Sequence, residues 1–277
     1  MIIIDSLKRY FRRSLLGVNA DTKTAKNIKY GHLTGILYMA PGDLSGVNFC
    51  PFASAGCLAA CLFKSGRGKF STVENARIKK GILFNKDRET FFYNLIKDLQ
   101  SLRRKALKMG LTASARLNGT SDLMFHKLSL NYQGKKYKNI MELFPDIIFY
   151  DYTPRPVEFW DKLPSNYELT FSRKEDNPAA TAAAIAAGVN VAIPFGSDVL
   201  PDFYQVLDSS KNSGFKLVPV VNGDRHDIRL KSFDGSGVII GLTEKKTGVK
   251  DESGFIVPGL YEITAAGLVS MYQERNF

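Results

Sequence analysis

Three cysteines lie close together in the first quarter of the sequence, and they are the residues best suited to hold a metal. Cys50, Cys57 and Cys61 are separated by six and by three residues. Thiolates are soft ligands that bind zinc and iron–sulfur clusters. Three of them leave a four-coordinate site one ligand short. A [4Fe–4S] cluster with one open iron fits this set, and so does zinc with a histidine as its fourth ligand. In a third interpretation the cysteines bind no metal and are buried as small apolar residues.

The composition of the surrounding segment favours a metal site over plain burial. Pro41, Pro51, Gly56 and Gly66 indicate a wrapped loop and not a core helix. We therefore favour the [4Fe–4S] cluster and keep zinc as the alternative. A zinc site would need one of three histidines that do not neighbour the cysteines in sequence, His32, His126 and His226.

A second group of candidates consists of charged and polar side chains that follow short apolar runs. In α/β barrels the catalytic residues stand on the loops that leave the carboxyl ends of the strands. We therefore expect this group to line a pocket beside the cysteines, with catalytic or substrate-binding roles. Its members are Arg116, Asn118, Asp122, Asp151, Arg173, Asp224, Asp227 and Lys245.

Some of these residues have two interpretations that the sequence leaves open. Asp224 and Asp227 suit Mg²⁺ binding or acid–base chemistry. They equally suit a turn whose carboxylates pair with nearby arginines. Asp122 suits the binding of a polar substrate, or a supporting role beside a helix cap. Arg173 suits a phosphate clamp or a pairing with the acidic residues that follow it.

The elements that must position these residues begin with short apolar strands. Seven runs have the length and composition of strands. They cover residues 35–40, 111–117, 146–152, 167–171, 189–195, 215–221 and 237–242.

Helices are predicted between most of these strands. Ser71 followed by Glu74 is typical of a helix start, and Gly110 and Gly188 are placed to end two helices. The predicted helices run from residue 71, over 91–102, over 177–187, over 202–211, and from about residue 260.

Alternating strands and helices are typical of parallel βαβ units. We predict one α/β domain over residues 1–277, with a basic N-terminal arm over residues 1–34. The expected architecture is a complete or partial (β/α) barrel with the cysteine-rich loop after its first strand. A doubly wound open sheet is the alternative, because spacing does not distinguish the two.

The charge of the chain is concentrated in two segments. The net charge is +11, and residues 64–108 hold thirteen Lys or Arg against four Asp or Glu. The N-terminal arm is also basic. Such patches attract polyanions, so nucleic acid is the expected partner, although solvated helix faces give the same pattern. The apolar runs are too short to span a membrane. Clustered thiols suit a reducing compartment, so we expect a cytoplasmic protein. The sequence does not indicate the oligomeric state.

Eight segments together resemble a family of phage and plasmid proteins that are often labelled rolling-circle replication initiators or mycobacteriophage gene products. The resemblance covers residues 22–257 and implies a role in DNA replication. Initiators of the usual kind hold a metal on two histidines separated by one residue, and this chain has no such pair. The segments are LYMAPGDLSGVNFCPFASAGCLAACLFKSGRG, ARIKK, RLNGTSD, FPDIIFYDYT, YELTFSRKEDN, NVAIPF, NGDRHDIRL and GLTEKK.

The cysteine loop after the first strand is also similar to that of radical S-adenosylmethionine enzymes. This similarity implies a barrel of that kind and S-adenosylmethionine as a cofactor, although those enzymes space their cysteines three and two residues apart. The leading hypothesis is a phage-type iron–sulfur enzyme that acts on nucleic acid or a nucleotide-like substrate. The alternatives are a metal-dependent DNA-nicking or replication-initiation protein, and a zinc-stabilised nucleic-acid-binding protein.

Overall fold

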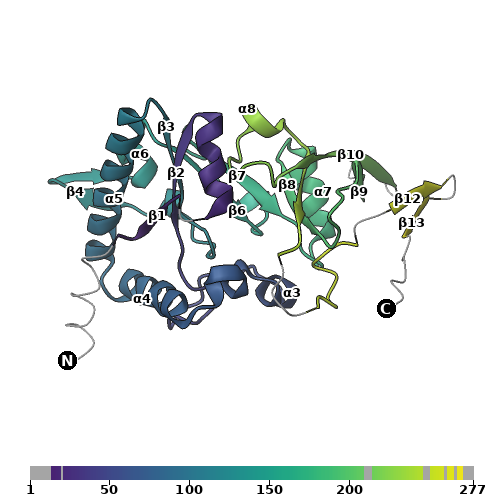
Figure 1. Cartoon of the computed structure of the whole chain (residues 1–277), viewed down its shortest axis with the longest axis horizontal. Coiled ribbons are helices and arrows are strands. Elements are labelled where there is room, and N and C mark those ends of the chain that lie inside the picture. Colours follow the sequence, from purple (N-terminus) through teal and green to yellow (C-terminus); the bar gives the residue numbers. More distant parts are fainter. Residues whose placement is uncertain are drawn as a thin grey trace.

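The computed structural model describes residues 14–19, 21–208, 214–245 and 250–258, together with the backbone of two strands at 261–264 and 267–270. A large sheet forms the centre of the molecule, and helices cover it (Figure 1). Within these residues, none of the helices is both long and apolar enough to cross a membrane.

The central sheet has nine strands in the order β1-β2-β3-β6-β7-β8-β11-β10-β9. The seven inner strands run parallel to one another, and the edge strands β1 and β9 are antiparallel to their neighbours. The strands are β1 (Leu16–Val18), β2 (His32–Leu37), β3 (Thr112–Arg116), β6 (Ile148–Thr153), β7 (Tyr167–Ser172), β8 (Val191–Phe195), β9 (Phe203–Leu207), β10 (Phe215–Asn222) and β11 (Ile239–Thr243).

Alternation along the strands gives the sheet one apolar and one polar face. In β3, Ala113 and Ala115 belong to the main hydrophobic core, whereas Ser114 and Arg116 point to the other face. Helices α5 (Arg88–Lys108) and α7 (Pro178–Ala186) pack on the apolar face, and the short helix α6 (Ile140–Leu143) belongs to the same core as α5. Helix α4 (Ser71–Lys86) packs against α5 beyond the carboxyl end of β2 (Figure 1). The polar face is covered by α2 (Thr22–Lys26), the 3-10 turn η1 (Asn27–Tyr30) and the loop that contains α8 (Lys231–Asp234).

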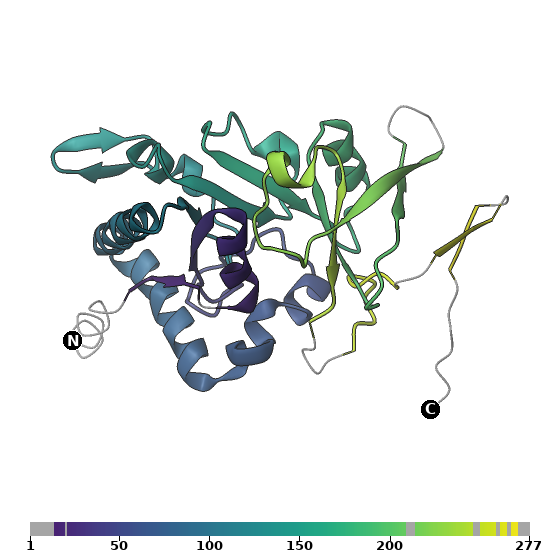
Figure 2. The ribbon, with the colours of Figure 1, turned by 45° about the horizontal axis from the view of Figure 1, so that its top comes forward.

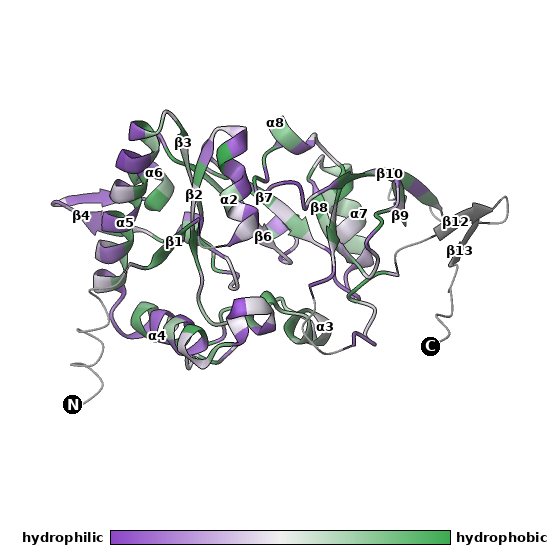
Figure 3. Cartoon of the chain, viewed as in Figure 1, coloured by the Kyte–Doolittle hydropathy of each residue, from purple (hydrophilic) through white to green (hydrophobic). Residues whose placement is uncertain are grey.

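Helix α5 shows why the sequence folds this way. Asp87 caps its first turn by accepting a hydrogen bond from the Thr90 backbone N–H at 3.0 Å. Its apolar residues recur at helical spacing and are buried against β2 and β3, and its other face is hydrophilic (Figure 3). Each buried Leu or Phe contributes about 1.5–3 kcal/mol. Gly110 ends the helical segment with a φ of +65°, as predicted.

A group of aromatic rings connects these helices to the cysteine segment. The Phe84 ring of α4 packs edge-on against Phe91 of α5, with 5.1 Å between centroids. On its other side Phe84 packs against Phe49, at 5.7 Å. Phe49 is only 2% exposed and directly precedes Cys50. The start of the cysteine segment is therefore fixed by the hydrophobic core.

The barrel prediction is wrong. All seven predicted strands exist, but they lie in an open, mixed sheet of nine strands whose two edges, β1 and β9, are not paired with each other in the described part of the chain. The late strand β11 lies between β8 and β10, and the antiparallel edge strands end the parallel order (Figure 2). Nothing in this arrangement shows a radical-S-adenosylmethionine-like barrel.

Two predicted helices are also wrong. Residues 203–207 form strand β9, in which Phe203, Gln205 and Leu207 alternate with buried or partly buried residues. Near residue 260 the chain forms the hairpin of β12 (Tyr261–Thr264) and β13 (Gly267–Ser270).

The remaining elements are short. The hairpin of β4 (Leu130–Tyr132) and β5 (Lys135–Tyr137) turns through Gln133 and Gly134, both with positive φ. The segment predicted as an N-terminal arm contributes β1, α2 and η1, and its residues 1–13 and 20 lie outside the described part of the chain. The other short helices are α3 (Ala55–Ala59), η2 (Leu62–Lys64), η3 (Gly66–Lys69), η4 (Phe125–Lys127) and η5 (Val157–Phe159).

Candidate functional site

The cysteine segment leaves the end of β2 and crosses the carboxyl ends of the neighbouring strands. Just after β3, the Asp122 backbone N–H donates to the Phe49 carbonyl at 2.8 Å. The Cys50 thiol contacts the Thr120 carbonyl, with 3.9 Å between Sγ and O. The first cysteine is therefore held against the loop that follows β3.

Helix α3, which carries Cys57, is held by a carboxylate from beyond β7. Glu175 accepts hydrogen bonds from the Ser54 hydroxyl at 2.7 Å and from the Gly56 backbone N–H at 3.0 Å. The Ser54 oxygen in turn accepts from the Cys57 backbone N–H at 3.2 Å. Gly56 has no room for a side chain, because a Cβ there would lie 2.8 Å from Glu175 Oε1 and 2.8 Å from Phe255 Cβ. Glu175 and Gly56 together set the position of Cys57.

The three cysteines form no disulfide, are partly buried and lie within electrostatic reach of one another. Burial is the main cause that raises the pKa of Cys50 to about 11, and the nearby Cys61 contributes to this rise. Burial likewise raises the pKa of Cys57 to about 12, with smaller contributions from Cys61 and Cys50. Among the residues that the structure describes, however, no group of three or more His, Cys, Asp or Glu side chains is arranged to hold a metal ion. The structure thus gathers the thiols in one region without closing them into a ligand set.

Cationic side chains surround these thiols. The positive charge of Lys174 lowers the pKa of Cys57. The charges of Lys64 and Arg77 lower the pKa of Cys61, although burial raises both values. The Arg77 guanidinium lies over the Tyr38 ring, 4.7 Å from its centroid. These cations offset only part of the effect of burial, and the carboxylates of Asp122 and Glu175 add to the raised pKa values of Cys50 and Cys57.

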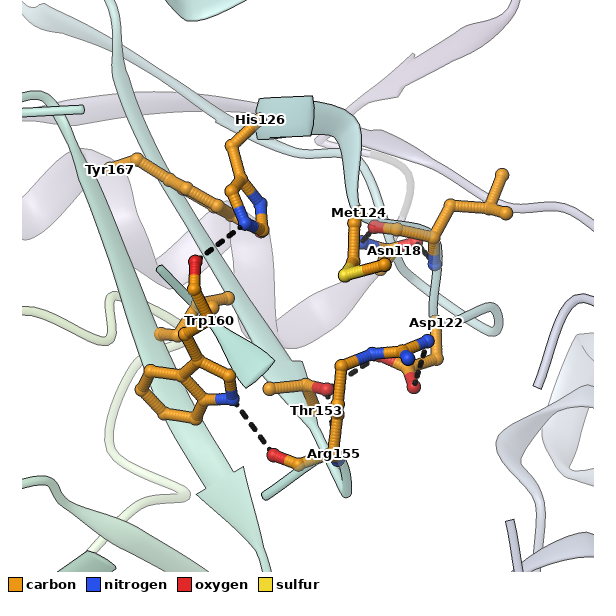
Figure 4. Close-up of a pocket in the computed structure, with 10 residues that line it drawn as sticks. Asn118, Asp122, Met124, His126, Thr153, Arg155, Trp160 and Tyr167 are labelled. Atoms are coloured by element: carbon orange, nitrogen blue, oxygen red, sulfur yellow. Dashed lines mark hydrogen bonds and ion pairs between the residues drawn. The ribbon is translucent and has the colours of Figure 1, made fainter. Parts of the chain in front are cut away.

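A polar group gathers around Asp122 and Arg155 (Figure 4), and Asp122 contacts Phe49, the residue before Cys50. Asp122 accepts a hydrogen bond from the Thr153 hydroxyl at 2.6 Å, and its other oxygen lies 3.8 Å from Arg155 Nη2. Burial raises the pKa of Asp122 to about 6. The Arg155 guanidinium covers the Phe52 ring at 4.4 Å, which connects this group to the cysteine segment. Asp122 thus lies where a substrate-binding carboxylate was predicted.

Asp151 and Asn118 lie close together, but their contacts are structural. The Asp151 carboxylate accepts from the backbone N–H groups of Leu117 and Asn118 at 3.3 and 2.8 Å. It also accepts from the Tyr167 hydroxyl at 3.2 Å and from the Asn118 amide at 3.4 Å. Asp151 is fully buried, and burial raises its pKa to about 7. Its role is to hold the loop after β3 in place.

Arg116 and Asp227 form an ion pair inside the polar face of the sheet. Arg116 Nη1 lies 3.0 and 3.1 Å from the two Asp227 oxygens, and the residues are 6% and 3% exposed. The Tyr150 hydroxyl donates to the same carboxylate at 3.3 Å, and the Asn27 side chain accepts from the Asp227 backbone N–H at 2.8 Å. These contacts tie the loop after β10 to β3, β6 and η1.

Asp224 faces a separate set of partners. It accepts from the Thr243 backbone N–H at 2.7 Å and from the Thr243 hydroxyl at 2.8 Å, and pairs with Lys245 at 3.2 Å. Although burial opposes it, the Thr243 and Lys23 contacts lower the pKa of Asp224 to about 2. The structure therefore does not bring Asp224 and Asp227 together as two ligands of one metal.

Arg173 reaches toward the last described segment of the central fold. Its Nη1 donates to the Gly254 carbonyl at 2.5 Å and to the Phe255 carbonyl at 2.9 Å. The neighbouring Lys174 pairs with Asp176 at 2.9 Å. Arg173 thus packs the segment 250–257 against the carboxyl end of β7.

Sequence reasoning missed the two residues that organise this end of the sheet. Glu175 and Arg155 stand in polar loops after β7 and β6, but nothing local indicates that they contact Gly56 and Phe52. Their only sequence signal is their position just after a predicted strand.

The chain matches the model of a known protein family. The family model described as Gene product 88 matches residues 8–259. The chain belongs to the Gene product 88 family. This places it among phage proteins and agrees with the phage part of the resemblance seen in the sequence. No curated protein and no solved structure matches the chain.

Proposed function

We propose that this Gene product 88 protein is an iron–sulfur enzyme that acts on nucleic acid or a nucleotide-like substrate. Cys50, Cys57 and Cys61 would bind a [4Fe–4S] cluster at the carboxyl end of the sheet. One observation carries the proposal: the segment that holds all three thiols is fastened over this end from two sides. Asp122 and Thr120 hold it near Cys50, and Glu175 holds it near Cys57.

The residues present fit such a cluster chemically. Thiolates are its usual ligands. A cluster on three thiolates carries net negative charge, and Lys174, Lys64 and Arg77 surround the thiols with positive charge. When bound in this way, the cluster supplies an open iron that can coordinate a substrate or a cofactor such as S-adenosylmethionine.

The chain's own residues would bind and orient the substrate. Exposed basic residues follow the last cysteine directly, in η2 and η3. Positive charge at the entrance to a site raises the local concentration of a polyanion. The residues concerned are Lys64, Arg67 and Lys69.

The other hypotheses draw less support from the contacts. A zinc site needs a fourth ligand, and none of the described histidines joins the cysteines in a group arranged to hold a metal ion; each histidine engages one ring nitrogen, with Ser114, Trp160 or Ile228 as its partner. A nicking site on two carboxylates needs Asp227, which pairs with Arg116.

Anaerobic purification tests the proposal. The protein should be brown, and Cys57→Ser should abolish the colour. Ala59→Ser on the same helix is the matched control, because it adds the same hydroxyl at an exposed position and keeps every thiol. Colourless wild-type protein, or colour that Cys57→Ser retains in full, would contradict the proposal. A further assay with single-stranded DNA should show binding that weakens steeply with salt.

A further inference from the structure

A small polar cavity lies between the carboxyl ends of β3 and β6, next to η5 (Figure 4). Its volume is about 10 Å³, which is roughly the room that one water-sized group needs. It adjoins the cysteine segment through the contacts of Asp122 with Phe49 and of Arg155 with Phe52. The residues that line it include Asn118, Asp122, His126, Thr153, Arg155 and Trp160.

Three buried polar atoms on the residues of this cavity have no hydrogen-bond partner among the described residues. They are Asp122 Oδ2, His126 Nδ1 and Arg155 Nε. The three residues are only 5%, 8% and 9% exposed. Buried polar groups are nearly always hydrogen-bonded, because leaving one unpaired is costly. Three such atoms around one small cavity indicate a site built to receive a polar ligand group.

The hydrogen-bonding roles of the three atoms define that group. His126 Nε2 lies 2.9 Å from the Trp160 carbonyl, which can only accept, so Nε2 carries the proton and Nδ1 is an acceptor. Asp122 Oδ2, which faces Arg155 Nη2 at 3.8 Å without a hydrogen bond, is a second acceptor. Arg155 Nε is a donor. The complementary ligand therefore offers N–H donors to Asp122 and His126, and an acceptor beside them to Arg155.

We propose that this cavity recognises the amino-bearing edge of a nucleobase. Cytosine, adenine and guanine each carry an exocyclic amino group next to a ring nitrogen or carbonyl acceptor. Uracil and thymine lack the amino group and present one N–H between two carbonyls. Only the amino group fits within the cavity, so the ring stays at its mouth.

The inference deepens the proposed function, because it names the substrate class at the same end of the sheet. It uses Asp122, which the sequence pointed to, and adds His126 and Arg155. All three are assigned as binding residues, and none is required to react.

The chain's single tryptophan provides the assay. Trp160 lines the cavity and donates its indole N–H to the Arg155 carbonyl at 2.8 Å. Its fluorescence should change saturably with cytidine, adenosine or guanosine, and about tenfold more uridine should be needed for any change. Equal responses to cytidine and uridine, or no response to any nucleoside, would overturn the inference. The second result means that the cavity holds water only.

A variant separates the binding group from its surroundings. Asp122→Asn should weaken cytidine binding about tenfold or more, because one acceptor becomes a donor. Asp146→Asn is the matched control at an exposed carboxylate and should bind as the wild type does. Undiminished binding by Asp122→Asn would count against the site. The cytidine–uridine comparison on the wild-type protein needs no variant and stands if Asp122→Asn does not fold.

The same titration on Cys57→Ser distinguishes this inference from the proposed function. Nucleoside discrimination in a protein without iron would sustain the inference while the cluster proposal fails. A brown protein that binds cytidine and uridine equally would sustain the cluster proposal while this inference fails.

Discussion

Replacing Asp227 by Asn should strongly destabilise the protein. The change keeps the shape of the side chain but removes the charge that faces Arg116 Nη1 at 3.0 and 3.1 Å. Because Arg116 is 6% exposed, its guanidinium would stay buried without a counter-charge. Removing one partner of a buried ion pair costs about 3–5 kcal/mol. The Tyr150 hydroxyl would also face an amide in place of a carboxylate.

The assay is urea unfolding, with the free energy of unfolding taken by linear extrapolation. The double variant Arg116→Met, Asp227→Leu should be more stable than Asp227→Asn, because it removes both charges together. Arg103→Met is the matched control. Arg103 pairs with Asp146 at 3.5 Å, but their side chains are 46% and 53% exposed. That pair should contribute less than about 1 kcal/mol.

A loss below about 1 kcal/mol for Asp227→Asn would refute the reasoning. It would show that buried Arg116 does not depend on the charge of Asp227, and would return Asp227 to the candidates for a catalytic or metal-binding carboxylate.

Three further changes follow from single contacts. Gly56→Ala should lower the free energy of unfolding by about 1–3 kcal/mol, because the new methyl group meets Glu175 and Phe255. Urea unfolding measures this loss, and the amount of bound iron should fall in the same variant. Asp151→Asn should cost about 1–3 kcal/mol, because its amide would face backbone donors in place of an acceptor oxygen; a fully stable variant would contradict this. His226 has its pKa lowered to about 4 by burial and by Arg229. The unfolded chain therefore binds the extra proton between about pH 6.5 and pH 4, and the stability due to neutral His226 should be lost as pH falls through that window. The difference in urea midpoint between the wild type and His226→Gln should shrink across the same range, and a constant difference would contradict the assignment.

The strands could be predicted from the sequence because each one is a short apolar run bounded by turn-forming residues. The order in which the strands lie side by side in the sheet could not be predicted. The run at 237–242 reads the same whether it follows β10 in space or lies between β8 and β10, as β11 does. The barrel prediction failed at this point, since an ordered series of parallel strands closes only if the last strand reaches the first.

The helix predicted over residues 202–211 was wrong for a different reason, because residues 203–207 form strand β9. Its residues suit a helix by composition, yet Phe203, Gln205 and Leu207 also alternate with Tyr204 and Val206. Pairing with β10 decides the outcome, because it buries Val206 and Val218 in the same core.

The candidate site was only partly accessible to sequence reasoning. The end of a strand can be located from the residues around it. The predicted strands therefore placed Cys50, Asp122 and Arg173 near the carboxyl end of the sheet. The roles of Glu175 and Asp227 come from residues 119 and 111 positions away, Gly56 and Arg116. No local pattern reports such contacts.

The central claim is that the three cysteines hold an iron–sulfur cluster, and the most direct measurement is the iron, sulfide and zinc content of anaerobically purified protein. The account predicts about four iron and four sulfide per chain, and neither in a variant with serine at all three cysteine positions. One zinc and no iron, or iron that persists in the triple variant, would contradict it.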